Sequence, residues 1–299
     1  MGRPDLLRCR AAAPISASGH YGHNAGVRQL VTIVLLLLVL GCARAHTQPA
    51  ALVGVLGITS EIVPVEKRVQ DGRDVTVRGF VFRQGTIGGR PVVVGRTGTG
   101  KVNAAIAATV LIGHFSPAVV FFSGTAGAVD PALAPGDVVI GTAVAHHDIG
   151  QQTPDGLQRR GPRHPISSEL DSVLLSAPDS LVDAARRATR ALTLPPMATG
   201  DSTPTPRIVE GLIVTGEMFV ANVAQREELR LSLNAAAVEM EGAAVVQTCR
   251  YFGVPCLVVR SITDRADGQA RASYQTLRAR ASENAAAVVA AIIGSLDPK

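Results

Sequence analysis

The chain has 299 residues, 46% of them hydrophobic, which is enough for a globular protein with a substantial buried core. Its formal net charge is +5, but residues 1–45 hold five of the 29 basic side chains and one of the 24 acidic ones, so the remainder carries 24 and 23 and is nearly neutral. Because aromatic residues make up only 3% of the chain and tryptophan is absent from the sequence, a nucleic-acid-binding protein is disfavoured.

The first 45 residues have the pattern of a secretory leader. A run of leucine, valine and isoleucine follows an arginine-bearing start and is too short to span a bilayer. Two processing signals overlap after this run: residues 39–42 resemble a bacterial lipobox, with Cys42 as the lipidated cysteine, and residues 43–45 fit ordinary cleavage. We expect a signal peptide at residues 1–45, a mature domain at 46–299, and an exported protein that is periplasmic or a membrane-anchored lipoprotein.

From residue 51 onward, strand-like and helix-like segments alternate along the chain. Strands are predicted at residues 53–57, 73–82, 91–94, 118–122, 137–143, 213–214 and 256–262. Helices are predicted at residues 101–114, 180–192, 224–233, 241–252 and 271–296, with loops at 151–163 and 193–206. The second and third strands are expected to form a hairpin through Gly88 and Gly89. This alternation indicates a single α/β domain of three layers, α/β/α, with a mixed central sheet.

A glycine-rich segment at residues 95–102 resembles the phosphate-binding loop of nucleotide triphosphatases. It matches that pattern except at Val102, where the pattern requires a serine or threonine that holds Mg²⁺. The substitution removes a metal ligand, which disfavours a nucleotide triphosphatase. The alternative is a tight turn from a strand into a helix that begins near Lys101.

Three acidic side chains lie near the ends of predicted strands. Glu239 and Glu241 flank Met240, and Asp264 follows an apolar run at residues 254–259. The carboxyl edge of the sheet is where open α/β folds bind their ligands. Carboxylates gathered there indicate acid–base chemistry on a polar substrate.

Eight segments, taken in order, resemble the nucleoside phosphorylase and nucleosidase superfamily. The pattern is most similar to that of the 5′-methylthioadenosine/S-adenosylhomocysteine nucleosidases, and the resemblance covers about residues 52–293. Its most specific parts are Val-Glu-Met-Glu at 238–241 and Ser-Ile-Thr-Asp at 261–264. The segments are residues 54–61, 97–104, 123–127, 136–139, 147–148, 215–219, 238–241 and 260–264.

The resemblance implies hydrolysis of the bond that joins adenine to ribose, through a transition state like an oxocarbenium ion. By the same resemblance, Asp264 is the acid that protonates N7 of the purine, and burial is expected to raise the pKa of its carboxyl group. The substrate-binding residues that it implies are Glu241 on the ribose hydroxyls, Met240 on the sugar with Glu239 beside it, Phe219 on the adenine ring, Val220 at the base edge, and Gly127 in the glycine-rich segment after the fourth strand.

The general base is the least direct assignment. The family shows three consecutive acids after its first strand, whereas this chain has only Ser60 and Glu61 there. With a one-residue gap Glu61 takes the place of the water-activating base, supported by Thr125 and Arg260. Without that gap Ile62 falls at this position and the base is missing.

Two other activities remain open from the sequence. Phosphorylases of this superfamily hold phosphate with arginines, and the corresponding places here carry residues 58–60 and 121–122, which contain none, although Arg96 is a possible substitute. A non-catalytic exported nucleoside-binding protein would also fit the shortened acidic segment. The exported location differs from the family's usual cytoplasmic setting, so the physiological nucleoside stays open.

No cofactor or metal is expected. His146 and His147 are adjacent on a predicted strand, so their side chains point to opposite faces and do not form a ligand pair. The spacing of Cys249 and Cys256 is not that of a metal site, and two buried thiols are expected in preference to a disulfide. Family members are usually homodimers, and the resemblance extends that expectation to this chain.

Overall fold

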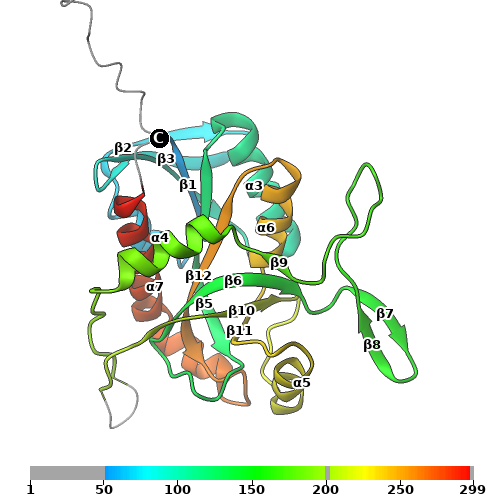
Figure 1. Ribbon diagram of the computed structural model, residues 1–299. Helices are drawn as coiled ribbons and strands as arrows, with labels where there is room; N and C mark the ends of the chain where they lie inside the picture. The colour runs from blue at the N-terminus through cyan, green and yellow to red at the C-terminus, as the bar shows by residue number, and fades with distance from the viewer. Residues whose placement is uncertain (1–50, 199–202, 297–299) are drawn as a thin grey trace, which may run out of the picture. The chain divides into compact units, whose positions relative to one another are not determined.

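The computed structural model describes residues 51–198 and 203–296 (Figure 1). The predicted leader and Cys42 lie outside the described residues. Within the described ranges, no helix combines the length and the hydropathy that a membrane crossing requires.

A ten-stranded mixed sheet forms the centre of the fold, in the order β11-β10-β6-β12-β5-β1-β4-β3-β2, with β9 beside β6. The strands β4, β1, β5 and β12 are mutually parallel, whereas β6, β10 and β11 run antiparallel to β12. The strands are β1 (Val53–Ile58), β2 (Gln70–Val77), β3 (Phe80–Ile87), β4 (Arg90–Thr97), β5 (Val119–Ala128), β6 (Val138–His146), β7 (Gly150–Thr153), β8 (Gly156–Arg159), β9 (Leu175–Ser176), β10 (Ile208–Thr215), β11 (Ala237–Glu239) and β12 (Cys256–Asp264).

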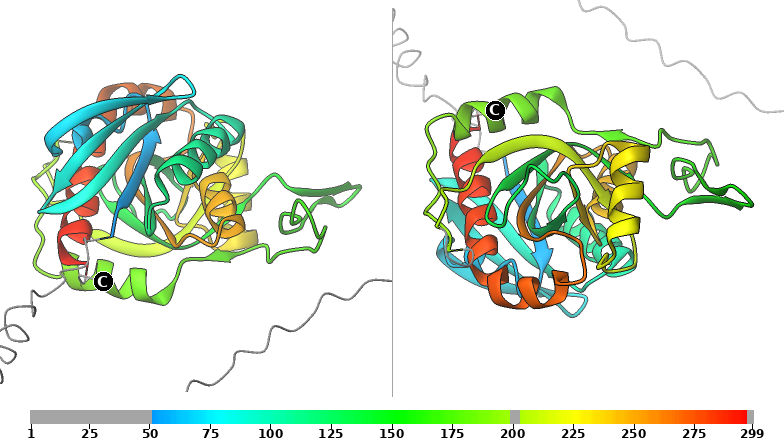
Figure 2. Two further views of the ribbon diagram at one scale, coloured as in Figure 1. Left: turned by 90° about the horizontal axis from the view of Figure 1, so that it is seen from above. Right: turned by 90° about the horizontal axis from the view of Figure 1, so that it is seen from below.

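Helices cover both faces of the sheet, as the two views of Figure 2 show. On one face α3 and α6 pack through a core that includes Leu111 and Val245. On the other face α4 and α7 pack through a core that includes Leu181 and Val289. The predicted three-layer α/β/α fold is therefore confirmed. The helices are α2 (Val63–Glu66), α3 (Lys101–Phe115), α4 (Asp179–Thr189), α5 (Val223–Leu233), α6 (Gly242–Tyr251) and α7 (Ala270–Ser295).

The sheet closes on itself at one end. β11 pairs in parallel with β10 and antiparallel with β5, where Val238 lies opposite Gly127. This closure brings the end of β11 beside the ends of β5 and β12, although β5 is far from the other two strands in the sequence. The carboxyl edge of β1 adjoins them through β5.

β10 is longer than the strand predicted at residues 213–214, and β9 and α2 were not predicted. Three further segments differ from the sequence-based prediction. The expected strand at residues 73–82 is two strands, β2 and β3, with a turn at Arg78 and Gly79, whose φ values are 52° and 86°. The expected loop at 151–163 contains the hairpin β7–β8, because a short polar hairpin lacks an apolar periodicity. The hairpin through Gly88 and Gly89 is confirmed.

The third difference concerns β5, which was predicted to end at residue 122 but continues through the glycine-rich residues 123–128. A Cβ at Gly124 would collide with Arg260 Nη1 and would lie 2.6 Å from Glu61 Oε2. A glycine is therefore needed at position 124 because the Arg260 and Glu61 side chains cross the strand there. This glycine does not mark a turn of the chain. Both Cys249 and Cys256 are buried free thiols, as expected.

Candidate active site

A cavity of about 420 Å³ lies at the ends of β1, β5, β11 and β12, beside the first turns of α7. This volume is in the range of small-molecule sites, roughly 300 to 1,000 Å³. The carboxyl groups of Glu61, Glu241 and Asp264 all line it. Every predicted catalytic and substrate-binding residue lines it except Arg260, which lies behind the wall and donates a hydrogen bond to Glu239.

Glu61 follows β1 in the turn that leads into α2, and its side chain is only 3% exposed. Its carboxylate accepts hydrogen bonds from the Thr125 backbone N–H at 2.7 Å, from Thr125 Oγ1 at 2.6 Å and from the Tyr274 hydroxyl at 3.1 Å. Ile62, the alternative at this place, is fully buried in the core beneath α7. The chain therefore presents Glu61 to the cavity, held by three donors.

Asp264 is the last residue of β12 and is 3% exposed. Its Oδ1 accepts the Ala266 N–H at 2.9 Å, and its Oδ2 lies 2.7 Å from Thr263 Oγ1. Burial raises the pKa of Asp264 above its ordinary value, and these two hydrogen bonds oppose the rise only in part. The site therefore favours the protonated carboxyl group more than water does.

Glu239 anchors the start of α6. Its carboxylate accepts the Gly242 N–H at 2.8 and 2.9 Å and the Glu241 N–H at 3.2 Å, and it also accepts from Thr215 Oγ1 and from Arg260. A carboxylate at a helix N-terminus is stabilised by the backbone N–H groups that have no partner within the helix. Although Glu239 lines the cavity, its oxygens are engaged by the protein, so its contribution is to position its neighbours.

Arg260 is fully buried and lies over the Phe122 ring, 4.2 Å from the ring centroid. Against the effect of burial, the charges of Glu239, Glu241 and Glu61 raise the pKa of Arg260. The guanidinium stays charged and supplies the positive charge that three neighbouring carboxyl groups require.

Glu241 accepts the Gly100 N–H at 2.8 Å and lies 3.7 Å from Arg260. Burial, followed by the charge of Glu239, raises the pKa of Glu241 to about 8. At neutral pH this carboxyl group retains a proton, so it can donate one hydrogen bond and accept another. That combination suits a pair of neighbouring hydroxyl groups on a ligand.

The loop that resembles a phosphate-binding loop is occupied by carboxylates. The Gly100 and Lys101 amides donate to Glu241 and Glu217, and Lys101 Nζ pairs with Asp148 at 2.7 Å. The Gly100 and Lys101 N–H groups, which would help to bind a phosphate in such a loop, already have carboxyl partners. The prediction of a strand-to-helix turn agrees with this arrangement.

Phe219 and Val220 reach the cavity from the segment between β10 and α5. The Phe219 ring meets the Tyr274 ring edge-on, with centroids 6.0 Å apart. Glu217, in the same segment, receives a backbone hydrogen bond from Lys101 and donates its own N–H to Asp148. These contacts fix the segment that carries the aromatic wall.

Four cavity residues on α7 were not predicted: Arg271, Tyr274, Gln275 and Arg278. Their spacing of three, one and three residues puts them on one helical face, which is a signal that the sequence contains. Burial raises the pKa of Tyr274, so its hydroxyl keeps the proton that it donates to Glu61.

The two histidines do not form a metal pair. His146 Nε2 lies 3.0 Å from Gln247 Oε1, whereas His147 packs against Gly216, and burial lowers the pKa of both rings. Across the described ranges, no cluster of three or more His, Cys, Asp or Glu side chains is arranged to hold a metal ion.

Comparison with known proteins bears on this site. Residues 49–294 match the family model described as the phosphorylase superfamily. The chain is 32% identical over 247 residues to a 5′-methylthioadenosine/S-adenosylhomocysteine nucleosidase of Staphylococcus carnosus, covering 82% of this chain and all of the relative.

Solved structures give the same picture. The Neisseria meningitidis 5′-methylthioadenosine/S-adenosylhomocysteine nucleosidase, in complex with methylthio-immucillin-A, has a TM-score of 0.70 at 32% identity, over 82% of this chain and 100% of that one. The futalosine hydrolase of Helicobacter pylori has a TM-score of 0.69 at 27% identity, over 83% and 99%. The chain belongs to the phosphorylase superfamily, and its relatives there are nucleosidases.

Proposed function

We propose that this protein hydrolyses the N-glycosidic bond of an adenine nucleoside such as 5′-methylthioadenosine or S-adenosylhomocysteine, releasing adenine and the ribose moiety. The observation that carries the proposal is that Glu61, Glu241 and Asp264 line one cavity. The names of the relatives reported above, two 5′-methylthioadenosine/S-adenosylhomocysteine nucleosidases and a futalosine hydrolase, support it.

Asp264 is the acid of this reaction. Departure of adenine leaves electrons on the base, and a proton on N7 stabilises them. Burial favours the protonated carboxyl group. Thr263 Oγ1 can donate its single proton either to Asp264 Oδ2, at 2.7 Å, or to the Ala126 carbonyl oxygen, at 3.2 Å.

Glu61 is the base that activates water. It has only donors as hydrogen-bond partners in the described structure, so it is oriented as an acceptor. A water molecule that donates to Glu61 would lose its proton as it attacks the anomeric carbon. Thr125 and Tyr274 hold the carboxylate through hydrogen bonds, and the buried positive charge of Arg260 attracts its negative charge.

Ribose and adenine occupy the remaining walls. The protonated Glu241 binds the ribose hydroxyls, with Met240 against the sugar. Phe219 supplies an aromatic surface for the purine, and Val220 lies beside it.

A phosphorylase is disfavoured by the charges at the cavity. Arg96 donates two hydrogen bonds to Glu66, at 2.6 and 2.7 Å, and is not among the residues that line the cavity. A phosphate dianion near the sugar would meet acidic walls and find Arg260 already engaged by Glu239. A binding protein without catalysis is disfavoured because the shortened acidic segment still brings Glu61 into the cavity.

The test is a panel of 5′-methylthioadenosine, S-adenosylhomocysteine, adenosine and inosine, each with and without phosphate, followed by chromatography of the released base. Hydrolysis of the adenine nucleosides at a rate independent of phosphate is expected. A rate that rises strongly with phosphate would establish the phosphorylase, and tight binding without turnover would establish the binding protein.

The proposed localisation is outside the cytoplasm, through the leader at residues 1–45, with a lipid on Cys42 as the favoured anchor. The support is the sequence pattern alone. Mass spectrometry of the membrane fraction tests it, since a mature chain beginning with unmodified His46 would remove the lipoprotein.

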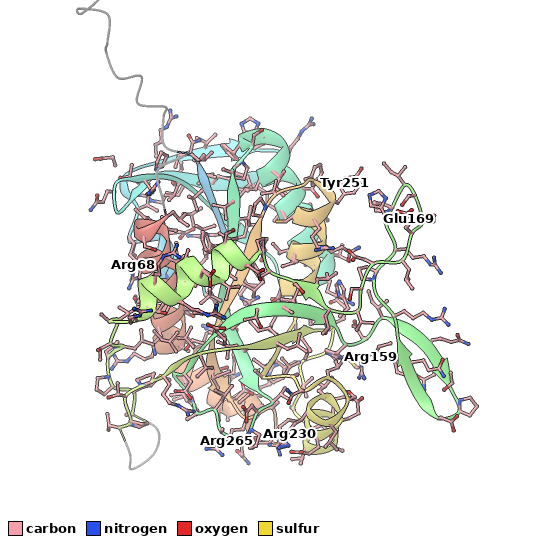
Figure 3. The ribbon with its side chains drawn as sticks, in the orientation of Figure 1. Arg68, Arg159, Glu169, Arg230, Tyr251 and Arg265 are labelled. Atoms are coloured by element: carbon pink, nitrogen blue, oxygen red, sulfur yellow. The ribbon has the colours of Figure 1, made fainter. Side chains whose placement is uncertain are left out.

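A homodimer is also proposed. Large apolar side chains are exposed on the outer side of α3, at the end of α6 and on the projecting segment of residues 150–174, called the arm. In Figure 3 Tyr251, on α6, lies on the side toward the arm, which carries Glu169. A cavity of about 890 Å³ lies between α6 and the arm. A second copy would cover this surface. The residues are Val102, Ile106, Ile166, Leu170, Tyr251 and Phe252.

A further inference from the structure

The cavity has opposite charges at its floor and at its mouth. Its acidic side chains, such as Glu61 and Asp264, are almost completely buried. The residues that α7 contributes are more exposed and include two arginines, Arg271 and Arg278. A ligand that fills the cavity therefore meets carboxyl groups inside and guanidinium groups where it approaches solvent.

Neither mouth arginine forms an ion pair with an acid in the part of the chain that the structure describes. Other arginines, among them Arg96 and Arg159, have carboxylate partners within 2.8 Å. The Arg278 guanidinium lies over the Tyr274 ring, 5.5 Å from its centroid. Arg278 also forms a hydrogen bond with the Tyr274 side chain, and a guanidinium held in this way keeps further N–H groups that can bind an anion.

The orientation of the substrate rests on the function proposed above. With adenine at Asp264 and the ribose hydroxyls at Glu241, the 5′ substituent is the part of the nucleoside left to extend to the mouth. Tyr274 contacts Glu61 on the sugar side, and Arg278 lies one turn further along α7, about 6 Å along the helix axis. Arg278 therefore lies on the far side of the proposed ribose site from the proposed adenine site.

We propose that Arg278 binds a carboxylate at the end of the 5′ substituent. The preferred substrate class is then an adenine nucleoside with an anionic 5′ tail. S-adenosylhomocysteine carries such a carboxylate in its amino-acid tail, whereas 5′-methylthioadenosine ends in a methyl group. A guanidinium–carboxylate pair provides two parallel, charge-assisted hydrogen bonds, which gives both affinity and orientation.

The test compares kcat/KM for three substrates: S-adenosylhomocysteine, its decarboxylated analogue and 5′-methylthioadenosine. In the wild type the first is expected to exceed the analogue about tenfold, the effect of one charge-assisted contact. Arg278→Gln should lower the ratio of S-adenosylhomocysteine to 5′-methylthioadenosine by about the same factor. Arg280→Gln, which changes an exposed arginine of α7 outside the cavity, is the matched control and should keep the wild-type ratio.

Added salt should also lower kcat/KM for S-adenosylhomocysteine more than for 5′-methylthioadenosine, because ions screen an exposed pair. If the wild type hydrolyses all three substrates but Arg278→Gln and the double variant with Arg271→Gln leave the ratio unchanged, the tail site is wrong and the proposed function stands. If the wild type hydrolyses none of them, the proposed function fails and the tail site fails with it.

Discussion

At the scale of single residues, the site depends on the different environments of three carboxyl groups, those of Glu61, Glu241 and Asp264. Glu61 is surrounded by donors, Glu241 is buried beside another carboxylate, and Asp264 is buried at the end of an apolar strand. In the proposed mechanism these environments suit the three groups to accepting a proton, binding hydroxyl groups and donating a proton, respectively. The residue types and their order were predictable, whereas the contact between Tyr274 and Glu61 was not, because it joins residues 213 positions apart in the sequence.

Asp264→Asn should reduce kcat by about 100- to 10,000-fold, because an amide cannot supply the proton that adenine needs as it leaves. Substrate binding should persist, since the amide oxygen of the introduced asparagine can still accept the Ala266 N–H. Steady-state kinetics together with calorimetric binding measures both effects. Asp155→Asn, at the exposed tip of the β7–β8 hairpin, is the control, and an unchanged kcat in the Asp264 variant would remove this residue from the mechanism.

Glu241→Gln should change how stability depends on pH. The carboxyl group of Glu241 ionises at its ordinary pKa of 4.5 in the unfolded chain and at about 8 in the folded one. Between these values the unfolded state binds fewer protons, so the wild-type free energy of unfolding falls as pH rises, by at most about 1.4 kcal/mol per pH unit from this residue. Below pH 4.5 and above pH 8 this slope disappears.

The glutamine variant lacks this contribution, so its stability relative to wild type should increase from pH 5 to pH 8. Urea unfolding at several pH values measures the difference, with the exposed Glu169→Gln as the control. Parallel curves for wild type and the Glu241 variant would contradict the raised pKa.

At the scale of elements, continuous apolar runs were the predictable part. β12 and the first half of β5 are buried on both faces. Both were identified from their sequences, because a continuous apolar run is the pattern typical of a strand that is buried on both faces. The hairpin β7–β8 and the extra residues of β10 were missed because their pairing is decided by partners elsewhere and leaves little local pattern. The second half of β5 was missed because glycine is uncommon in strands, and the need for Gly124 arises only from the Arg260 and Glu61 side chains that cross it.

The segment that carries Phe219 is held by side chains of other elements, so its position is testable. Asp148 accepts from Lys101 Nζ at 2.7 Å and from the Glu217 N–H at 3.0 Å. Although burial opposes it, these bonds lower the pKa of Asp148, and the residue stays charged at neutral pH. Asp148→Asn should raise KM about five- to tenfold, the loss of one charge-assisted contact, with a smaller change in kcat.

The smaller effect on kcat is expected because the proposed acid and base lie on other elements. Asp183→Asn, on α4 and paired with Arg186 at the surface, is the matched control. An unchanged KM in the Asp148 variant would show that this contact does not position the aromatic wall.

At the scale of the whole molecule, closure of the sheet is what creates the site. β11 returns to β5, and only then do residues near positions 61, 241 and 264 face one cavity. The spacing of residues along the chain does not predict this closure. That Glu61, Glu241 and Asp264 lie at one cavity was expected only because the order of the motifs resembles that of the superfamily. Family likeness therefore supplied what local pattern could not, while the α7 face toward the cavity could have been found from helical spacing.

The proposed homodimer gives a test at the same scale. Ile106 on α3 is 47% exposed, and a charge there should separate the two copies if this surface is the interface. Ile106→Asp should sediment at half the mass of the wild type. Leu231→Asp, on α5 and 80% exposed, should remain dimeric, and a wild type that sediments as a monomer would contradict the proposal.

The most direct test of hydrolysis at this site is the origin of the oxygen on the released sugar. The reaction of 5′-methylthioadenosine in oxygen-18 water, with phosphate present, should give adenine and a ribose product with one labelled oxygen at the anomeric carbon, detected by mass spectrometry. Asp264→Asn should give the same product far more slowly. A ribose 1-phosphate product without the label would contradict the account, because phosphate and not water would then be the nucleophile.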